Sequence, residues 1–449
     1  MNENHYVDIG VVRIQSWLTR TPKLRGRRGG STLITQATDP DAISRTLAWI
    51  GDVAAINDEA GRIDGVVSLK LNDPNRSDEA ERAVVRHLRE HMPGVSVSVT
   101  KAQGPNYAKA RADSTEPSQE WPAPVAEWPA GRRCEWCSTW PAVPPENRAG
   151  EQEPICAECV SRSKAAGRAE RREQTPYAEK HLLEKLETEF AVPDEFETLA
   201  RLDGKRETHL ALVYADGNGI GRFIRETLQS RKLSKQYNLK ISQKIDDATW
   251  ESLVSSVREI QRDDDEELPI VPHTVGGDDV LVSVPARRAW QFVHTLLDAF
   301  DQHVRQQLQA SAGPSLSAGV VLHHYTLPLF QINELAKRAL RQAKVATGGQ
   351  AASLAWHDTT RDGREPIDRS AVKFEDLKTY WKALSELAAL PNSARKQLDD
   401  VAGAFGEAST ELHEHAQRVD SAPVVRPFRQ PGSPIALVDA LGMARWWWK

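Results

Sequence analysis

The sequence predicts an α+β protein built from two ferredoxin-like units, with a cysteine module between them and a helical region at the C-terminus. Helix-like and strand-like segments follow one another in the order βαββαβ over residues 5–103, and again over residues 207–358. All four cysteines lie between these two stretches. We therefore expect five segments: a first ferredoxin-like unit (1–103), a Pro-rich linker (104–130), a cysteine module with a helical connector (131–204), a second ferredoxin-like unit (205–360) and a helical domain (361–449).

The first unit carries both strand and helix periodicities. Strands are expected at Tyr6–Val12, Val53–Ile56, Val66–Leu71 and Val95–Val99, and helices around Ile14–Leu18 and Glu79–His91. Residues 104–130 have little periodicity and are rich in proline, which is typical of a linker or an irregular surface segment. The prolines are Pro105, Pro117, Pro122, Pro124 and Pro129.

The second unit begins with a nearly continuous apolar run from Leu210 to Ala215, as expected for a strand buried on both faces. Two further apolar runs, Ile270–Val275 and Val280–Val284, flank Gly276-Gly277-Asp278-Asp279, which predicts a hairpin. Helices are expected at about 240–262, 293–308 and 332–343, and strands at Ser315–Leu322 and Ser353–His357. This arrangement is ferredoxin-like with one added strand.

The composition narrows the class of protein. Of the 449 residues, 40% are hydrophobic and 27% charged, as in an ordinary globular protein. The segment Met1–Gly10 has no signal-peptide core, and no apolar run reaches the roughly 18 residues of a membrane helix. We therefore expect a cytoplasmic protein without a membrane partner. The formal net charge is -5, so contact with a nucleic acid would need a local basic patch.

One such patch precedes Gly29-Gly30 and is called here the basic segment. Its members are Arg20, Lys23, Arg25, Arg27 and Arg28. The pattern predicts a contact with RNA or with nucleotide phosphate. A solvated loop or a protein interface would account for the same residues.

Two other features have simpler expectations. The acidic run from Asp263 to Glu267 is expected as a solvated loop. The terminal tryptophans Trp446, Trp447 and Trp448 would either pack within the chain or dock on a partner.

The cysteines form two C-x2-C pairs, Cys134 with Cys137 and Cys156 with Cys159. In a reducing compartment this spacing favours a metal over disulfides. Four thiolates give zinc a closed tetrahedral site, which is structural rather than catalytic. We expect one structural Zn²⁺ per chain.

Three carboxylates are candidates for catalysis. Asp216 follows the first strand of the second unit, and Asp278 and Asp279 lie at the hairpin. The two strands are neighbours in a ferredoxin-like sheet, so the carboxylates could converge at one edge and hold two Mg²⁺ or Mn²⁺ ions. The glycines beside them, Gly217, Gly276 and Gly277, leave room for a triphosphate to approach the backbone. An inert hairpin turn and a helix cap at Asp216 are the structural alternatives.

Several motifs, taken in order, carry a family resemblance. They are Leu212-Val213-Tyr214-Ala215-Asp216-Gly217-Asn218-Gly219, Gly276-Gly277-Asp278-Asp279, Ser315-Leu316-Ser317-Ala318-Gly319-Val320, Pro328-Leu329 and the helix Ala336–Lys344. The second unit resembles the polymerase-like palm domain of the large subunit of type III CRISPR effector complexes, a relative of GGDEF nucleotide cyclases. Asp8-Ile9-Gly10 and Ile14-Gln15 resemble the opening of that family's first palm.

The resemblance implies an activity. Members of this family make 3′–5′ linked cyclic oligoadenylates from ATP in antiviral defence. It implies that Asp216, Asp278 and Asp279 hold the two catalytic metal ions. It also implies nucleotide binding around Gly217, Asn218, Gly276, Gly277 and Lys344, with Lys344 contacting the triphosphate unless it is an ordinary helix-surface lysine. The implied partners are ATP and RNA or an RNA-guided CRISPR complex.

The chain departs from the family pattern in three places. Asn218 stands where many relatives carry a second acid, which puts the number of metal ligands in doubt. No histidine–aspartate nuclease motif precedes Tyr6, so we expect no DNase activity. The first unit has Asp8 alone and a hairpin at Asn57–Gly61 without a double glycine, as expected for a degenerate palm.

Two other functions remain as alternatives. One is a catalytically silent scaffold or RNA-sensing subunit of a CRISPR complex, against which the intact Asp216 and Gly276–Asp279 argue. The other is a GTP-using dinucleotide cyclase, against which the lack of a full GGDEF string argues.

Overall fold

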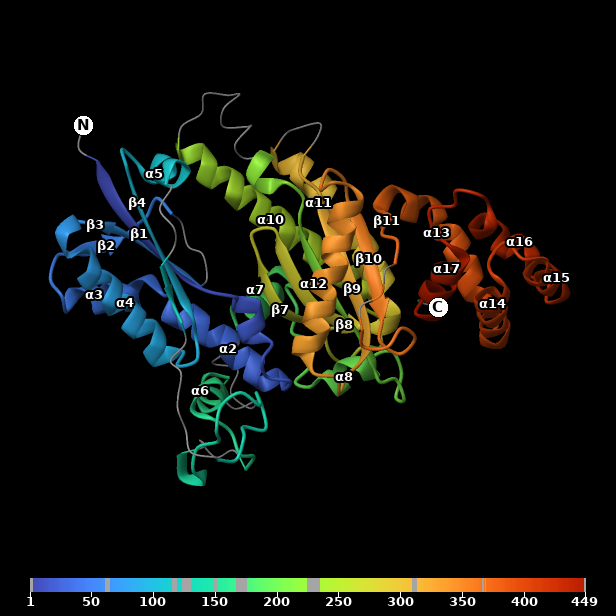
Figure 1. Cartoon of the computed structure of the whole chain (residues 1–449), viewed down its shortest axis with the longest axis horizontal. Helices are drawn as coiled ribbons and strands as arrows, with labels where there is room; N and C mark the ends of the chain where they lie inside the picture. The colour runs from blue at the N-terminus through green and yellow to red at the C-terminus, as the bar shows by residue number, and fades with distance from the viewer. Residues whose placement is uncertain are drawn as a thin grey trace. The chain divides into compact units, whose positions relative to one another are not determined.

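The structure is a computed structural model (Figure 1), and it describes residues 3–60, 65–114, 119–122, 131–147, 152–166, 176–223, 235–308, 313–365, 367 and 369–447. The chain divides into two compact units, Met1–Lys180 with Pro328–Phe330, and His181–Leu327 with Gln331–Lys449. Pro117, Pro124 and Pro129 of the expected linker, and Trp448, lie outside the described residues. No helix among the described residues is long and apolar enough to cross a membrane.

The first unit contains an antiparallel sheet that confirms the predicted ferredoxin-like arrangement. Its strands lie in the order β2 (Ala54–Ile56), β3 (Val66–Leu71), β1 (Asn4–Val11), β4 (Val97–Gly104) and β5 (Gln119–Trp121). The helices of this part are α1 (Ile14–Leu18), α2 (Leu24–Ala37), α3 (Pro40–Ala48) and α4 (Ser77–His91). Apolar side chains from α2, α3, α4 and the central strands form one core, because each element has one apolar face to bury.

The segment expected as a Pro-rich linker, 104–130, has regular structure in its described part. Asn106 directly precedes helix α5 (Tyr107–Asp113), and its side chain caps the helix by accepting a hydrogen bond from the Lys109 amide. Strand β5 extends the sheet beside β4. The prediction of a linker, which was based on the many prolines, is therefore wrong for this part of the segment. Pairing of β5 with the distant strand β4 outweighs the weak local preferences of the sequence.

The cysteine module contains helix α6 (Ala157–Ala165) and leads to α7 (Tyr177–Leu186) and α8 (Phe196–Arg201). Helix α6 packs closely on α2 within the first unit. A Cβ atom added to Gly29 would lie 1.7 Å from the carbonyl oxygen of Arg162, so only glycine permits this approach.

The second unit contains a six-stranded sheet with the predicted ferredoxin-like core. Its order is β11 (Val372–Lys373), β10 (Ser353–Asp358), β9 (Leu316–His324), β6 (His209–Gly217), β8 (Asp279–Pro285) and β7 (Val271–Gly276). Strands β6 and β8 are neighbours, as predicted, and β10, parallel to β9, is the expected added strand. The short β11 is a further strand that the sequence did not predict. Leu210–Val213 in β6 are fully buried, which explains the continuous apolar run.

Three long helices complete this palm-like part: α10 (Lys235–Ile260), α11 (Ala289–Leu308) and α12 (Leu329–Ala346). Helices α10 and α11 pack along each other. Helix α12 packs closely on β9. A Cβ atom added to Gly319 of β9 would lie only 2.3 Å from the carbonyl oxygen of Ala336 in α12. The expectation that the acidic run Asp263–Glu267 is a solvated loop is wrong for Asp265. This residue is 7% exposed and forms an ion pair with the buried Arg288 at 2.6 Å.

The C-terminal region is helical, as predicted. It contains α13 (Phe374–Ala389), α14 (Asn392–Phe405), α15 (Thr410–Arg418), α16 (Ala422–Val425) and α17 (Leu437–Arg445). Trp446 is buried and donates a hydrogen bond to Asp358 in β10 at 2.7 Å, and Trp447 packs against Trp381. These two tryptophans therefore pack within the chain and join the helices to the sheet.

Candidate active site

The Gly276–Asp279 motif forms the tight hairpin that the sequence predicts. Strand β7 ends at Gly276, which pairs with Asp279 at the start of β8, so Gly277 and Asp278 are the two loop residues. Gly277 has φ +62°, a left-handed conformation that glycine adopts without strain. The motif is therefore a genuine turn, and its chemistry depends on what surrounds it.

Asp216 lies at the same end of the sheet as the hairpin. The register between β6 and β8 runs as far as Ala215 and Val280, the residues directly next to Asp216 and Asp279. A Cβ atom added to Gly217 would be 2.4 Å from Oδ2 of Asp278, so the glycine allows the Asp278 carboxylate to come close to the β6 backbone. The structure thus brings the three predicted acids to one edge.

Burial makes this edge electrostatically unusual. Desolvation raises the pKa of Asp278, and it raises the pKa of Asp279 to about 6, with the charge of Asp278 adding to the effect. Burial also raises the pKa of Tyr214 on β6, and the negative charges of Asp279 and Asp278 raise it further. Oδ1 of Asp279 is buried and has no hydrogen-bond partner in the described part of the chain. A divalent cation would supply the missing counter-charge, so the residues fit a metal site.

Lys344, near the end of α12, contacts the first acid directly. Its Nζ forms an ion pair with Oδ2 of Asp216 and donates a hydrogen bond to the carbonyl oxygen of Gly217 at 2.9 Å. Burial lowers the pKa of Lys344. The sequence marked this lysine as a contact for a triphosphate but did not indicate its pairing with Asp216.

The three acids do not form a converged ligand set like that of the cysteines. Among the residues that the structure describes, the four cysteines are the group of three or more Cys, His, Asp or Glu side chains whose ligand atoms come together. In this structure Asp216 pairs with Lys344 instead. The roles of Asp216, Asp278 and Asp279 as metal ligands therefore stay a prediction.

The side-chain nitrogen Nδ2 of Asn218 is hydrogen-bonded to other groups of the chain. It donates to the hydroxyl oxygens of Ser315 and Ser317, at 3.0 and 2.9 Å, and to the carbonyl oxygen of Ala351 at 3.1 Å. These bonds join the end of β6 to β9 and to the loop before β10. The predicted contact of Asn218 with nucleotide would have to use its carbonyl oxygen, which is buried without a partner among the described residues.

Two side chains that no motif marked also reach this edge. Asp246 and Thr249 on α10 contact the backbone of Gly277. A lone acid and a lone threonine on a long helix carry no signal in a single sequence, so only the fold reveals them.

The corresponding acid of the first unit is already satisfied by protein groups. Asp8 on β1 accepts hydrogen bonds from the Ser68 hydroxyl at 2.5 Å and the Tyr107 hydroxyl at 2.9 Å. Arg111 lies 3.2 Å away and neutralises its charge. The Asp8 carboxylate is thus bonded to protein groups in this structure, and the degenerate nature of the first unit stays a prediction.

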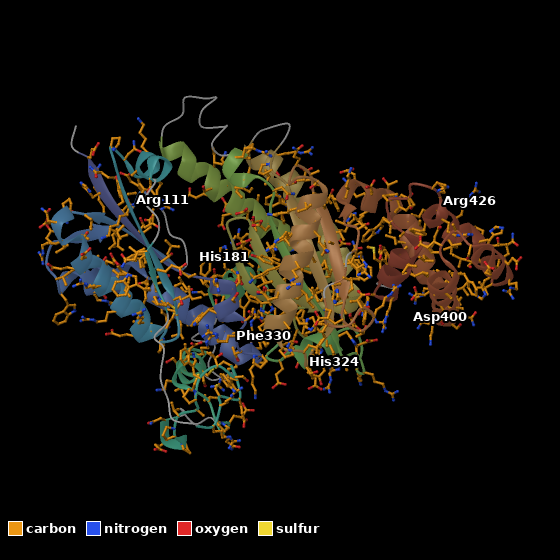
Figure 2. All side chains as sticks on the ribbon, viewed as in Figure 1. Arg111, His181, His324, Phe330, Asp400 and Arg426 are labelled. Atoms are coloured by element: carbon orange, nitrogen blue, oxygen red, sulfur yellow. The ribbon has the colours of Figure 1, made fainter. Side chains whose placement is uncertain are left out.

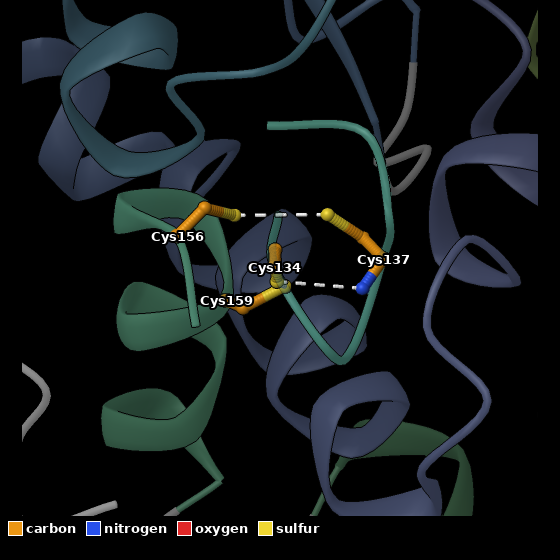
Figure 3. A group of neighbouring side chains, drawn as sticks. All are labelled: Cys134, Cys137, Cys156 and Cys159. Carbon is orange, nitrogen blue, oxygen red and sulfur yellow. Dashed lines mark hydrogen bonds between the residues drawn. The ribbon is translucent and has the colours of Figure 1, made fainter. Parts of the chain in front are cut away.

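The four cysteines gather as predicted (Figure 3). All are buried and free of disulfides, and their Sγ atoms lie within 4.8 Å of one another. Cys134 and Cys159 are separated by 3.6 Å, and Cys137 and Cys156 by 3.7 Å. A tetrahedral site with Zn–S bonds of about 2.3 Å has sulfur–sulfur edges of roughly 3.8 Å, so the cluster fits zinc.

The basic segment is not a solvated loop, which corrects one of the expected alternatives. Its C-terminal part belongs to α2, and three ion pairs connect the segment to acids of the cysteine module and α7: Arg20–Glu158 at 3.0 Å, Lys23–Glu153 at 2.5 Å and Arg28–Glu179 at 2.7 Å. Arg27 is only 3% exposed, and burial lowers its pKa. Much of this positive charge is therefore used within the chain.

Comparisons with known proteins agree with this architecture. Residues 209–352 match the family model of the Cas10/Cmr2 second palm domain. No curated protein sequence matches the chain. Among solved structures, the crystal structure of Csm1 in T.onnurineus has a TM-score of 0.54 at 13% identity, covering 99% of this chain and 69% of that one.

Two ligand complexes of the Csm1–Csm4 cassette are similarly close. The complex with AMPPNP has a TM-score of 0.57 at 14% identity, covering 99% of this chain and 69% of the other. The complex with cA4 has a TM-score of 0.55 at 13% identity, covering 99% and 70%. Residues 209–352 are thus similar to the Cas10/Cmr2 second palm domain, and the chain has a fold like that of Csm1.

Proposed function

We propose that this chain is a nucleotidyltransferase that joins nucleotides from ATP into cyclic oligoadenylates in CRISPR-type antiviral defence. The observation that carries the proposal is the buried, unpartnered Oδ1 of Asp279, next to Asp278 and at the same sheet edge as Asp216. Buried carboxylates without partners are costly unless they bind a cation. The solved Csm1–Csm4 structures with AMPPNP and with cA4 support the choice of an adenine nucleotide.

The residues of this edge have separable roles. Asp216, Asp278 and Asp279 would hold two Mg²⁺ or Mn²⁺ ions, which activate an attacking 3′-hydroxyl and stabilise the pyrophosphate leaving group. Gly217 has no side chain that would displace the Asp278 carboxylate, and Gly277 adopts the left-handed conformation of the hairpin turn. Lys344 places a positive charge beside Gly217, where it can interact with a triphosphate.

The test is incubation of the full chain with each labelled nucleoside triphosphate and Mg²⁺ or Mn²⁺, with and without RNA, followed by mass spectrometry of the products. We expect oligoadenylates from ATP, and their loss in the variant with both Asp278→Ala and Asp279→Ala. A matched control is the double variant Asp263→Ala and Asp264→Ala, which removes two exposed acids of the same unit. Wild-type activity in the folded Asp278/Asp279 variant would show that the site is misplaced.

The same experiment separates the alternatives. A wild-type chain that makes no product from any nucleotide would favour a silent scaffold. Product from GTP instead of ATP would favour a dinucleotide cyclase.

We also propose that the chain works beside a Csm4-type subunit and RNA, as a member of a CRISPR complex. The support is the fold shared with Csm1–Csm4 structures. Because much of the basic segment is paired internally, its part in RNA binding must be tested against folding. Replacement of Arg25, Arg27 and Arg28 by Ala should weaken RNA affinity and its salt dependence. Thermal melting of the same variant shows whether a loss of affinity reflects a loss of structure.

A further inference from the structure

Two side chains of α10 hold the tip of the Gly276–Asp279 hairpin. The Gly277 amide donates a hydrogen bond to Oδ1 of Asp246 at 2.7 Å, and the Gly277 carbonyl oxygen accepts one from the Thr249 hydroxyl at 2.6 Å. The Thr249 hydroxyl also lies 3.0 Å from the carbonyl oxygen of Ile245, so its single proton is shared. Asp246 and Thr249 are three residues apart and therefore lie on the same face of the helix.

We call the pair Asp246 and Thr249 the latch. It binds the backbone of Gly277, which the strand pairing of the hairpin leaves without partners. In a two-residue hairpin, the first loop residue has no partner in the strand ladder, and its polar groups usually contact water. Here both polar groups of Gly277 are bonded to one helix. Two bonds fix the rotation of the tip as well as its position. Asp278 and Asp279 follow directly in the chain, so the latch restricts where their carboxylates point.

The helix that carries the latch is itself anchored in the second unit. Thr249 is fully buried, and its neighbour Trp250 is 1% exposed. His181, labelled in Figure 2, packs edge-on against Trp250 with ring centroids 4.6 Å apart. Lys185 forms an ion pair with Glu251 at 2.9 Å. The latch therefore connects the hairpin to a firmly packed support rather than to a mobile surface.

We propose that Asp246 and Thr249 are positioning residues that hold Asp278 and Asp279 in the geometry that binds divalent metal. This inference rests on the proposed function of the hairpin acids. The role requires hydrogen bonding rather than charge, since Oδ1 of an asparagine accepts the same bond as Oδ1 of Asp246. A serine hydroxyl likewise replaces that of Thr249.

The experiment measures Mn²⁺ binding to the full chain, with a non-hydrolysable ATP analogue present, by electron paramagnetic resonance of the free ion. We expect Asp246→Ala and Thr249→Val to weaken Mn²⁺ binding about tenfold, the usual effect of losing a residue that orients metal ligands. Asp246→Asn and Thr249→Ser should stay within about twofold of wild type, because each restores its hydrogen bond. Asp247→Ala is the matched control, since it removes the exposed neighbouring carboxylate.

Two results would overturn the inference. One is wild-type Mn²⁺ binding in Asp246→Ala and Thr249→Val while Asp278→Ala with Asp279→Ala loses it. The other is a loss of Mn²⁺ binding in Asp246→Asn as large as that in Asp246→Ala. That result would mean that the charge of Asp246 acts directly. Wild-type binding in the Asp278/Asp279 variant would instead show that the proposed metal site is wrong. Thr249→Val keeps the shape of the side chain, so it decides the question if Asp246→Ala does not fold.

Discussion

Lys344 on α12 pairs with the carboxylate of Asp216 and also donates a hydrogen bond to the carbonyl oxygen of Gly217, 2.9 Å away. The lysine thus connects the end of a long helix to the end of the central strand β6. Of the three candidate acids, Asp216 is the one that pairs with this lysine. Its contribution to the site can be separated from its contribution to the fold.

Lys344→Ala should lower nucleotide joining by about a hundredfold, because a preorganised positive charge near the reacting phosphates is lost. Lys337→Ala on the same helix is the matched control and should leave the rate unchanged. Lys337 pairs with Glu334 on the same helix. The measurement is the initial rate of product formation from ATP. An undiminished rate in Lys344→Ala would mean that the lysine only forms an ion pair with Asp216 and does not assist the reaction.

The cysteine cluster should contain one zinc ion per chain and should stabilise the first unit. Helix α6 begins next to Cys156 and carries Arg162, which is fully buried and donates hydrogen bonds to the carbonyl oxygens of Trp17 and Leu18 at 2.7 and 3.3 Å. Loss of zinc would release α6 and expose these groups. Elemental analysis of protein purified without added zinc tests the content.

The link between zinc and stability is tested with Cys159→Ser. This variant should lose zinc and melt at a lower temperature than wild type. Treatment of wild type with a chelator should reproduce the shift. A stable, metal-free wild-type protein would refute the site.

Gly319→Ala should destabilise the second unit by about 3 kcal/mol, because overpacking a close helix–sheet contact forces the backbones apart. Its new Cβ atom would lie 2.3 Å from the carbonyl oxygen of Ala336 and 2.5 Å from the amide nitrogen of Leu340. The control is Gly403→Ala in α14, where nothing lies within 4 Å. That variant should gain about 0.5–1 kcal/mol through helix propensity. Denaturant midpoints of both variants check the signs, and an unshifted midpoint in Gly319→Ala would contradict the packing.

His323 on β9 should make the second unit sensitive to acid. Burial lowers its pKa to about 4, and the neighbouring His209 and His324 add to the effect. The unfolded chain, with a histidine pKa near 6.5, then binds more protons between pH 6.5 and 4, so stability falls as pH decreases through this range. Between pH 7 and 5 the expected loss is about 2 kcal/mol.

Replacing His323 by leucine, which has a similar volume, should remove that part of the pH dependence. Denaturant midpoints at pH 7 and pH 5 for both proteins give the measurement. His303→Leu is the control, since His303 lies at a partly exposed position on α11. An equal pH dependence in wild type and His323→Leu would exclude a protonation of His323 that is linked to unfolding.

Much of the fold and the outline of the candidate site could be predicted from the sequence. The strands and helices of both ferredoxin-like units follow from local periodicity, and the Gly276–Asp279 hairpin follows from the conformational preference of glycine. Asp216 and the hairpin acids could be grouped because β6 ends at the edge where its antiparallel neighbour β8 begins. The cysteine cluster could be predicted because its two pairs have the spacing that metal sites use.

Only the tertiary structure decided the remaining contacts. The ion pairs of the basic segment with Glu153, Glu158 and Glu179 join residues far apart in the chain, and a single sequence does not pair distant charges. The same holds for Lys344 with Asp216, and for Asp246 and Thr249 with Gly277. The physical reason is that sequence patterns report local preference, whereas the partner of a buried polar group is set by which elements the core brings together.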